Sequence, residues 1–107
     1  MEVVKRFEVW LTALEPAVGS EMRKTRPCVV VSPDATNRHL NTVVIVPLTT
    51  APHDYAFRPT VAFASREAQL AIDQVRVLDR QRLLSRMGEL NEADSQLVLK
   101  FLRRFFT

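Results

Sequence analysis

Short apolar runs separated by polar, turn-forming segments occupy the first two thirds of the chain. The run FEVWLTAL over residues 7–14 predicts a first strand. The run CVVVSP over 28–33 is rich in β-branched residues and predicts a second strand that is buried on both faces. The segment between them, EPAVGSEMRKTRP, has a proline near each end and predicts a loop.

Later apolar stretches predict a series of further short strands. In TVVIVPLTT over 42–50, Pro47 interrupts the pattern and indicates an edge strand or a bulge. DATNRHLN before this strand and APHDYAFRPT after it are polar, and they predict turns and a loop. The other expected strands are 60–64, 71–78 and 85–90, with a short helical turn at 79–84.

The last segment, NEADSQLVLKFLRRFF, predicts an amphipathic helix. Asn91 is a favourable N-cap, and the acidic residues after it suit the positive end of the helix dipole. Apolar side chains recur at helical spacing and should pack on the sheet: Leu97, Val98, Phe101, Leu102 and Phe105. Many short strands and one terminal helix predict a mainly β, α+β fold, a small curved antiparallel sheet or barrel with a C-terminal helix.

The composition fits one domain over residues 1–107, because 47% of the residues are hydrophobic and 25% are charged. The apolar runs are too short to cross a bilayer and the N-terminus lacks secretory features, so we expect no membrane association. A single cysteine, Cys28, excludes an intrachain disulfide and favours a cytoplasmic protein with a buried, unreactive thiol. The net charge of +3 is mild and compatible with an anionic partner.

No metal-binding or nucleophile motif is evident. His39 and His53 lie in separate polar segments and one cysteine does not complete a zinc site, so we expect no metal and no cofactor. What remains is a set of polar residues at predicted strand ends, in which arginine, threonine and asparagine are prominent. Such side chains suit phosphate groups and single-stranded nucleic acid.

Each of these residues also has an ordinary structural explanation. The RKTR segment over 23–26 is typical of a solvated loop, and Thr49 is typical of a strand end. Asp73 and Arg76 could form a surface ion pair of little energetic weight. The residue types alone therefore leave both interpretations open.

Taken together, ordered motifs over nearly the whole chain resemble the MazF/PemK family of toxin endoribonucleases. The motifs are VKRFEVWL, EPAVGSEMRKTRPCVVVSPD, NRHLNTVVIVPLTT and IDQVRVLDRQRL. The resemblance implies an SH3-like β-barrel of the CcdB/MazF type and a homodimer. It also implies metal-independent cleavage of single-stranded RNA (mRNA) to a 2′,3′-cyclic phosphate and a 5′-hydroxyl. The implied partner is a cognate antitoxin whose disordered acidic tail blocks the RNA groove.

The resemblance places the family's catalytic arginine on Arg26 and its catalytic hydroxyl on Thr49. Arg26 is then expected to stabilise the negatively charged phosphorane, while Thr49 orients the phosphate. Glu21 is the candidate for the base that accepts the 2′-hydroxyl proton, or for a partner that positions Arg26. The expected RNA-binding residues are Ser20, Arg23, Lys24, Asn37, Arg38, Thr50, Asp73, Gln74 and Arg76.

Two departures from the family pattern affect these expectations. Phe7 and Glu8 stand where the family usually has Gly-Asp, so the first loop is expected to differ in shape. Ala71 stands where some members have an arginine, which leaves more of the catalysis to Arg26 and Thr49.

Two other functions remain alternatives. A CcdB-type gyrase inhibitor shares the fold, but such toxins typically end in Trp-Gly-Ile, whereas this chain ends in RRFFT. A non-catalytic nucleic-acid-binding module on an SH3-like barrel would suit the mild basic charge equally well.

Overall fold

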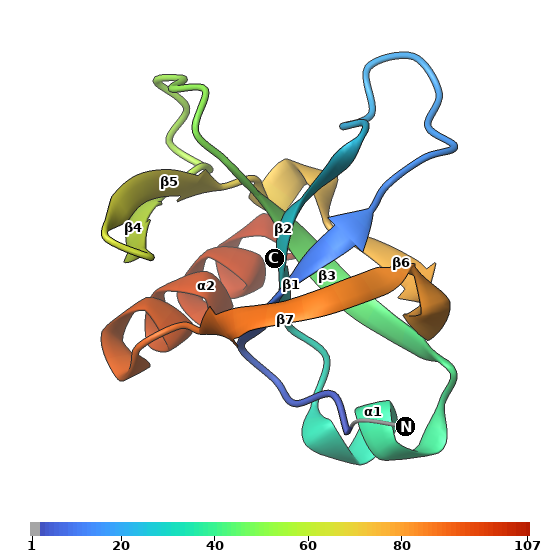
Figure 1. Cartoon of the computed structure of the whole chain (residues 1–107). Coiled ribbons are helices and arrows are strands. Elements are labelled where there is room, and N and C mark those ends of the chain that lie inside the picture. Colours follow the sequence, from blue (N-terminus) through green and yellow to red (C-terminus); the bar gives the residue numbers. More distant parts are fainter. Residues whose placement is uncertain (1–2) are drawn as a thin grey trace.

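Strands joined in antiparallel pairs form one curled sheet in the computed structural model, which describes residues 3–107 (Figure 1). The strands are β1 (Glu8–Ala13), β2 (Thr25–Val30), β3 (Thr42–Thr49), β4 (Thr60–Phe63), β5 (Arg66–Leu70), β6 (Arg76–Asp79) and β7 (Leu83–Glu89). The helical elements are α1 (Asp34–His39), η1 (Ile72–Gln74), η2 (Arg80–Arg82) and α2 (Glu92–Phe105). This architecture confirms the expected mainly β fold, with a curled antiparallel sheet and a C-terminal helix.

Strand β3 lies in the middle of the sheet, so of the two expectations for Pro47, an edge strand or a bulge, the edge strand is wrong. The strand order is β4-β5-β3-β2-β1-β7, and β6 also pairs with β3. Residues 42–45 of β3 pair with β6, whereas Leu48 and Thr49 pair with β5. Pro47 lies where β3 changes its partner, between Ile45, which pairs with β6, and Leu48, which pairs with β5.

The apolar run in and after β2 is buried on both faces, as its composition predicts. Cys28 and Val30 contribute to one core cluster, whereas Val29 and Val31 contribute to the other. Successive side chains of a strand point to opposite faces, so a strand between two cores needs apolar residues at every position. The strand itself begins earlier than the apolar run, at Thr25, and therefore includes Arg26.

Helix α2 begins after Asn91, whose side chain accepts a hydrogen bond from the Asp94 N–H, as the capping pattern predicts. Val98 is fully buried, and Leu97, Phe101 and Leu102 pack against the same core cluster. Phe105 does not complete this stripe, because it is 45% exposed. In residues 3–107, no helix is long and apolar enough to cross a membrane.

Residues 34–39 form helix α1 rather than the expected turns. Their Asp, Thr and Asn content disfavours helix in isolation, but tertiary contacts override this preference. The Asn37 side chain is buried, donating to the Ser32 carbonyl (2.9 Å) and accepting from the Ser32 hydroxyl (2.6 Å). These bonds join the helix to the end of the apolar run after β2.

The expected strand over 71–78 is replaced by the turn η1 followed by β6. Strand β5 ends at Leu70, and the Ala71 N–H donates to the Pro47 carbonyl (2.9 Å). The chain then turns through η1 and returns along the first half of β3. A single strand over 71–78 would have to pair with β3 at the point where β3 changes its partner from β6 to β5. The chain instead leaves the sheet at Ala71 and turns through η1. The expected helical turn near 79–84 is confirmed as η2.

Phe7 and Glu8, which stand where the family usually has Gly-Asp, lie where the first turn leads into β1. Phe7 has φ of +71°, a left-handed conformation that glycine adopts most easily. Its N–H donates to the Val30 carbonyl (2.6 Å), and its ring packs against the core. Glu8 is buried and accepts hydrogen bonds from the Lys5 N–H (2.9 Å), Trp10 Nε1 (3.1 Å) and Arg86 Nε (2.7 Å). Burial by itself would raise the pKa of Glu8, but these hydrogen bonds lower it below the ordinary value.

We expect Glu8→Gln to lower the free energy of unfolding at pH 7 by about 1–3 kcal/mol, because a charged acceptor of three hydrogen bonds is lost. Because the folded pKa is depressed, this contribution is present above the unfolded pKa and disappears as the pH falls through the folded pKa. Urea unfolding measured between pH 7 and pH 3 should therefore show the two proteins converging at acid pH. Glu67→Gln, at an exposed position of β5, is the control and should change stability little at either pH. An equal loss for Glu8→Gln at every pH would contradict the proposed charge effect.

Candidate functional site

Two loops rise from one end of the sheet, opposite the end that carries α1 (Figure 1). The first loop, residues 14–24, joins β1 to β2, and the second, residues 50–59, joins β3 to β4. Because β2 and β3 are antiparallel, the start of β2 and the end of β3 lie at this same end. The sequence candidates in these loops and strand ends are therefore brought to one place.

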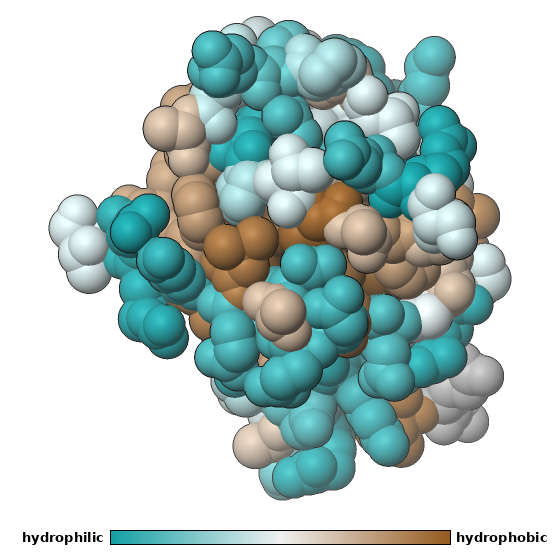
Figure 2. All heavy atoms as spheres, turned by 90° about the vertical axis from the view of Figure 1, so that its left-hand side faces the viewer, coloured by the Kyte–Doolittle hydropathy of each residue, from teal (hydrophilic) through white to brown (hydrophobic). Residues whose placement is uncertain are grey.

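Arg26 and Thr49 both lie at this end of the sheet. The pairing of β2 with β3 ends at Cys28 and Pro47, and Arg26 and Thr49 each lie two residues beyond that pair. Both residues line one hollow of about 440 Å³. The other lining residues come from both strand ends, the β4–β5 hairpin and β7: Pro27, Leu48, Thr50, Ala51, Phe63, Ala64, Arg66, Ala68 and Met87. Figure 2 looks at the molecule from the β4–β5 side and shows an apolar, hollowed area ringed by hydrophilic residues.

The hydrogen bonds of Arg26 and Thr49 leave donors for a ligand. Arg26 Nε donates to the Arg23 carbonyl (3.2 Å), which orients the guanidinium and leaves its terminal N–H groups for another acceptor. Thr49 Oγ1 accepts from the Ala51 N–H (3.2 Å), so its own O–H remains a donor. A guanidinium fork beside a hydroxyl donor can bind two oxygens of one phosphate group.

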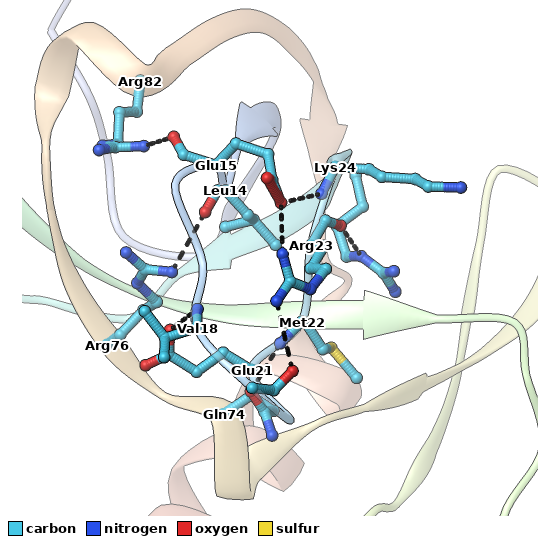
Figure 3. Close-up of polar contacts among 12 residues, drawn as sticks. Leu14, Glu15, Val18, Glu21, Met22, Arg23, Lys24, Gln74, Arg76 and Arg82 are labelled. Carbon is cyan, nitrogen blue, oxygen red and sulfur yellow. Dashed lines mark hydrogen bonds and ion pairs between the residues drawn. The ribbon is translucent and has the colours of Figure 1, made fainter.

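The other cations of the first loop are exposed. Arg23 lies 3.9 Å from the Glu15 carboxylate, a weak and solvated pair. Lys24 has φ of +68°, a conformation that turns the chain from the loop into β2. Its backbone carbonyl accepts from the Leu14 N–H (2.9 Å), and its side chain extends away from the loop (Figure 3).

Glu21 lies in a different hollow from Arg26. Its carboxylate accepts from the Val18 N–H (2.7 Å), while its own N–H donates to the Val18 carbonyl (3.1 Å), so it closes a turn of its own loop (Figure 3). With Ser20, it lines a hollow of about 420 Å³ that also includes Asp73, Gln74 and Arg76. The structure therefore gives Glu21 no contact with the Arg26 side chain.

The motif IDQVRVLDRQRL, residues 72–83, holds both loops in place through side-chain hydrogen bonds. Gln74 Oε1 accepts from the Met22 N–H (3.1 Å), and Arg76 donates to the Leu14 carbonyl (3.4 Å), so both hold the first loop (Figure 3). Arg82 reinforces this end by donating to the Glu15 carbonyl.

Asp73 anchors the second loop instead. Its two carboxylate oxygens accept from Nε and a terminal nitrogen of Arg58, both at 2.8 Å. These bonds lower the pKa of the Asp73 carboxyl and raise that of the Arg58 guanidinium.

Two of the expected RNA-binding residues lie away from this end. Asn37 and Arg38 belong to α1, at the opposite end of the sheet (Figure 1). Asn37 is 1% exposed and its amide is used by Ser32, so a ligand does not reach it. Arg38 is exposed but far from the hollow that Arg26 lines.

Sequence reasoning missed three features of this end. Arg66, at the start of β5, lines the hollow with Thr49, and no motif marks it. Arg58 pairs with Asp73, fifteen positions away in the sequence. His53, Tyr55 and Phe57 form a stack of rings, whose spacing of two residues was visible in APHDYAFRPT.

Cys28 lies directly behind the site but takes no part in it. Burial raises the pKa of its thiol to about 11, against the opposite influence of Thr12, Arg26 and Arg76 nearby. A thiol of this pKa is almost entirely protonated at neutral pH and reacts poorly as a nucleophile. The expectation of a buried cysteine is confirmed.

Comparison with known proteins identifies the family. Residues 5–106 match the family described as PemK-like, MazF-like toxin of type II toxin-antitoxin system. The chain belongs to this toxin family. It is 31% identical over 97 residues to the endoribonuclease EndoA of Bacillus subtilis, covering 84% of this chain and 83% of the relative.

Solved structures of PemK/MazF toxins have the same fold as this chain. The crystal structure of MazF from Deinococcus radiodurans superposes with a TM-score of 0.88 at 23% identity, covering 99% of this chain and 98% of that one. A MazE–MazF crystal structure from the same organism has a TM-score of 0.80 at 20% identity, covering 99% of this chain and 97% of that one. These likenesses extend over the whole sheet and the C-terminal helix, so the expected MazF-like fold is confirmed.

We expect Asp73→Asn to loosen the second loop of this toxin, because Arg58, only 10% exposed, loses its carboxylate partner. The free energy of unfolding should fall by about 1–3 kcal/mol, and chymotrypsin should cut faster after Tyr55 and Phe57. Asp54→Asn is the control: it makes the same charge change within the second loop itself, at an exposed residue with no ion pair to Arg58. Equal proteolysis of Asp73→Asn and wild type would show that the ion pair does not hold the loop.

Proposed function

We propose that this chain is an endoribonuclease toxin that cleaves single-stranded RNA, mRNA included, by attack of an internal 2′-hydroxyl. The observation that carries the proposal is the placement of Arg26 and Thr49 on one hollow, with hydrogen-bond donors of both side chains available to a ligand. Family membership supports it, since relatives such as EndoA are named endoribonucleases.

In the proposed reaction, the 2′-oxygen bonds to the neighbouring phosphorus and the bond from phosphorus to the 5′-oxygen breaks. The products are a 2′,3′-cyclic phosphate and a 5′-hydroxyl, with one proton leaving the 2′-hydroxyl and one reaching the 5′-oxygen. Negative charge accumulates on the phosphorane oxygens, where the Arg26 guanidinium stabilises it and the Thr49 hydroxyl orients it. Both groups are attached to paired strands, so their geometry is set before the substrate arrives.

The remaining basic and polar groups of this end bind the RNA backbone in this proposal. Arg23 and Lys24 on the first loop and Arg66 on the β4–β5 hairpin provide positive charge around the hollow. Thr50, which lines the hollow, and Ser20, on the first loop, provide hydroxyl groups. Asp73, Gln74 and Arg76 contribute by holding the two loops in place.

The proposal includes partners. Solved relatives include MazE–MazF complexes and an endoribonuclease with its cognate antitoxin, which supports an antitoxin partner for this toxin as well. We propose that an acidic, disordered tail of that antitoxin covers the basic end of the sheet. We also propose a homodimer that acts in the cytoplasm, where its RNA substrate is found.

The alternative functions are separated by one assay. Incubation of the protein with a long single-stranded RNA, with and without EDTA, should give the same fragments in both cases. Intact RNA together with gyrase-dependent DNA breaks would favour a CcdB-type inhibitor. RNA that is bound but never cut would favour a non-catalytic binding module.

We expect Arg26→Ala and Thr49→Val each to lower the rate of RNA cleavage by about 100- to 1000-fold, because each loses a donor to the phosphorane. Binding of the uncut RNA should weaken far less than turnover. Single-turnover kinetics with excess protein measure the chemical step directly. Arg103→Ala is the control, because it removes an arginine at an exposed position of α2 that does not line the hollow. This variant should leave the cleavage rate unchanged. A similar loss in both arginine variants would contradict a specific role for Arg26.

We expect Glu21→Gln to leave the acidic limb of the pH–rate profile in place, because Glu21 closes its loop and does not line the hollow of Arg26. The variant should instead lower the rate at all pH values by a similar factor. Loss of the acidic limb would identify Glu21 as the general base instead.

A further inference from the structure

Three aromatic rings form an ordered, exposed stack on the loop between β3 and β4. The His53 and Tyr55 rings lie 5.0 Å apart at an interplanar angle of 6°, and the Tyr55 and Phe57 rings lie 5.0 Å apart at 12°. Tyr55 is 45% exposed and Phe57 is 41% exposed. The three rings come from alternate residues, and the chain turns at residues 56 and 57, just after Tyr55. We call these three side chains the aromatic ladder.

The aromatic ladder is fixed at both ends. At its start, the His53 N–H donates to Gln69 Oε1 (3.1 Å) and the His53 carbonyl accepts from Gln69 Nε2 (2.8 Å). At its end, the Arg58 N–H donates to the Tyr55 carbonyl (3.0 Å), and the Arg58 guanidinium is held by Asp73. The two anchoring side chains, Gln69 on β5 and Asp73 in η1, lie outside the loop. The rings are therefore held in place without being buried in the core.

Exposed rings that are held in place favour a ligand that stacks. Tyr55 is the middle ring, so His53 and Phe57 are at the two ends of the ladder, where a further flat ring can be added. Nucleobases stack on aromatic side chains regardless of their identity, because each base has a π-face. A preorganised stack binds such a base without an ordering cost.

The ladder begins two residues after the hollow that Arg26 and Thr49 line. Ala51 lines that hollow and precedes His53 by only two residues, a span of at most about 7 Å along the chain. Arg66 on the neighbouring hairpin adds positive charge to the same hollow. A basic groove beside aromatic rings is the combination that proteins use to bind single-stranded nucleic acid.

We propose that a nucleobase flanking the cleaved phosphodiester stacks on an end of the aromatic ladder. This inference rests on the proposed ribonuclease function and adds to it the residues that hold a base. The ladder does not touch the reacting atoms. It supplies binding energy and fixes how far a flanking base lies from the phosphate held by Arg26 and Thr49.

The test uses two fluorescein-labelled oligomers of eight units, neither of which can be cut. One is a random-sequence pool of 2′-fluoro RNA, and the other has the same length and charge but no bases. We expect Tyr55→Leu and Phe57→Leu to raise the Kd for the pool by about 5- to 100-fold without changing the Kd for the abasic oligomer. Phe57→Trp should keep the wild-type affinity, and the new indole fluorescence should be quenched by the pool. Phe106→Leu, at a ring that is 69% exposed beyond α2, is the matched control and should bind both oligomers as wild type does.

Each result decides between specific conclusions, provided that thermal unfolding shows the variants to be folded. Unchanged binding of the pool by both leucine variants, in a protein that still cuts RNA, overturns the stacking proposal alone. Equal weakening for both oligomers also overturns it, since the ladder would then act on the backbone. Wild type that neither binds nor cuts RNA overturns the ribonuclease proposal and this inference together. Unchanged RNA binding with weakened binding of an acidic peptide would assign the ladder to a protein partner instead.

Discussion

The antiparallel register between β2 and β3 is the constraint on which this site depends. It brings the start of β2, with Arg26, and the end of β3, with Thr49, to one hollow, and residues buried on both sides of the sheet fix the two strands that carry them. A one-residue slip would send every side chain of β2 to the opposite face, which would turn Arg26 away from its present face and exchange Cys28 and Val30 with Val29 and Val31 between the two core clusters. The hydrophobic free energy that forms the core therefore also fixes the strands that carry the guanidinium and the hydroxyl.

The two loops at this end of the sheet are held mainly by polar side chains that lie outside them. Three of these side chains lie in η1 and the start of β6. Asp73 holds the second loop, while Gln74 and Arg76 hold the first. The motif that the family resemblance assigned to RNA binding thus has a structural role in this chain. This explains how a small domain can keep two long, exposed loops in a defined position beside a shared hollow.

The sequence predicts best what local pattern or motif order determines. The double-faced burial of CVVV, the cap at Asn91 and the position of Arg26 and Thr49 on one hollow all follow from spacing within short segments or from the family motifs. It fails where distant segments decide the outcome. Strand β3 changes partner at Pro47, and this break converts the expected strand over 71–78 into η1 and β6. Asn37 looks like a surface residue in sequence, and only its fit beside Ser32 buries it.

The contacts that hold the first loop end on its main chain: Gln74 accepts from the Met22 N–H, and Arg76 and Arg82 donate to the carbonyls of Leu14 and Glu15. Backbone groups are the same for nearly every amino acid, so these three contacts do not depend on which side chains stand at positions 14, 15 and 22. Proline at position 22 is the exception, since it alone among the twenty residues lacks the N–H that Gln74 requires.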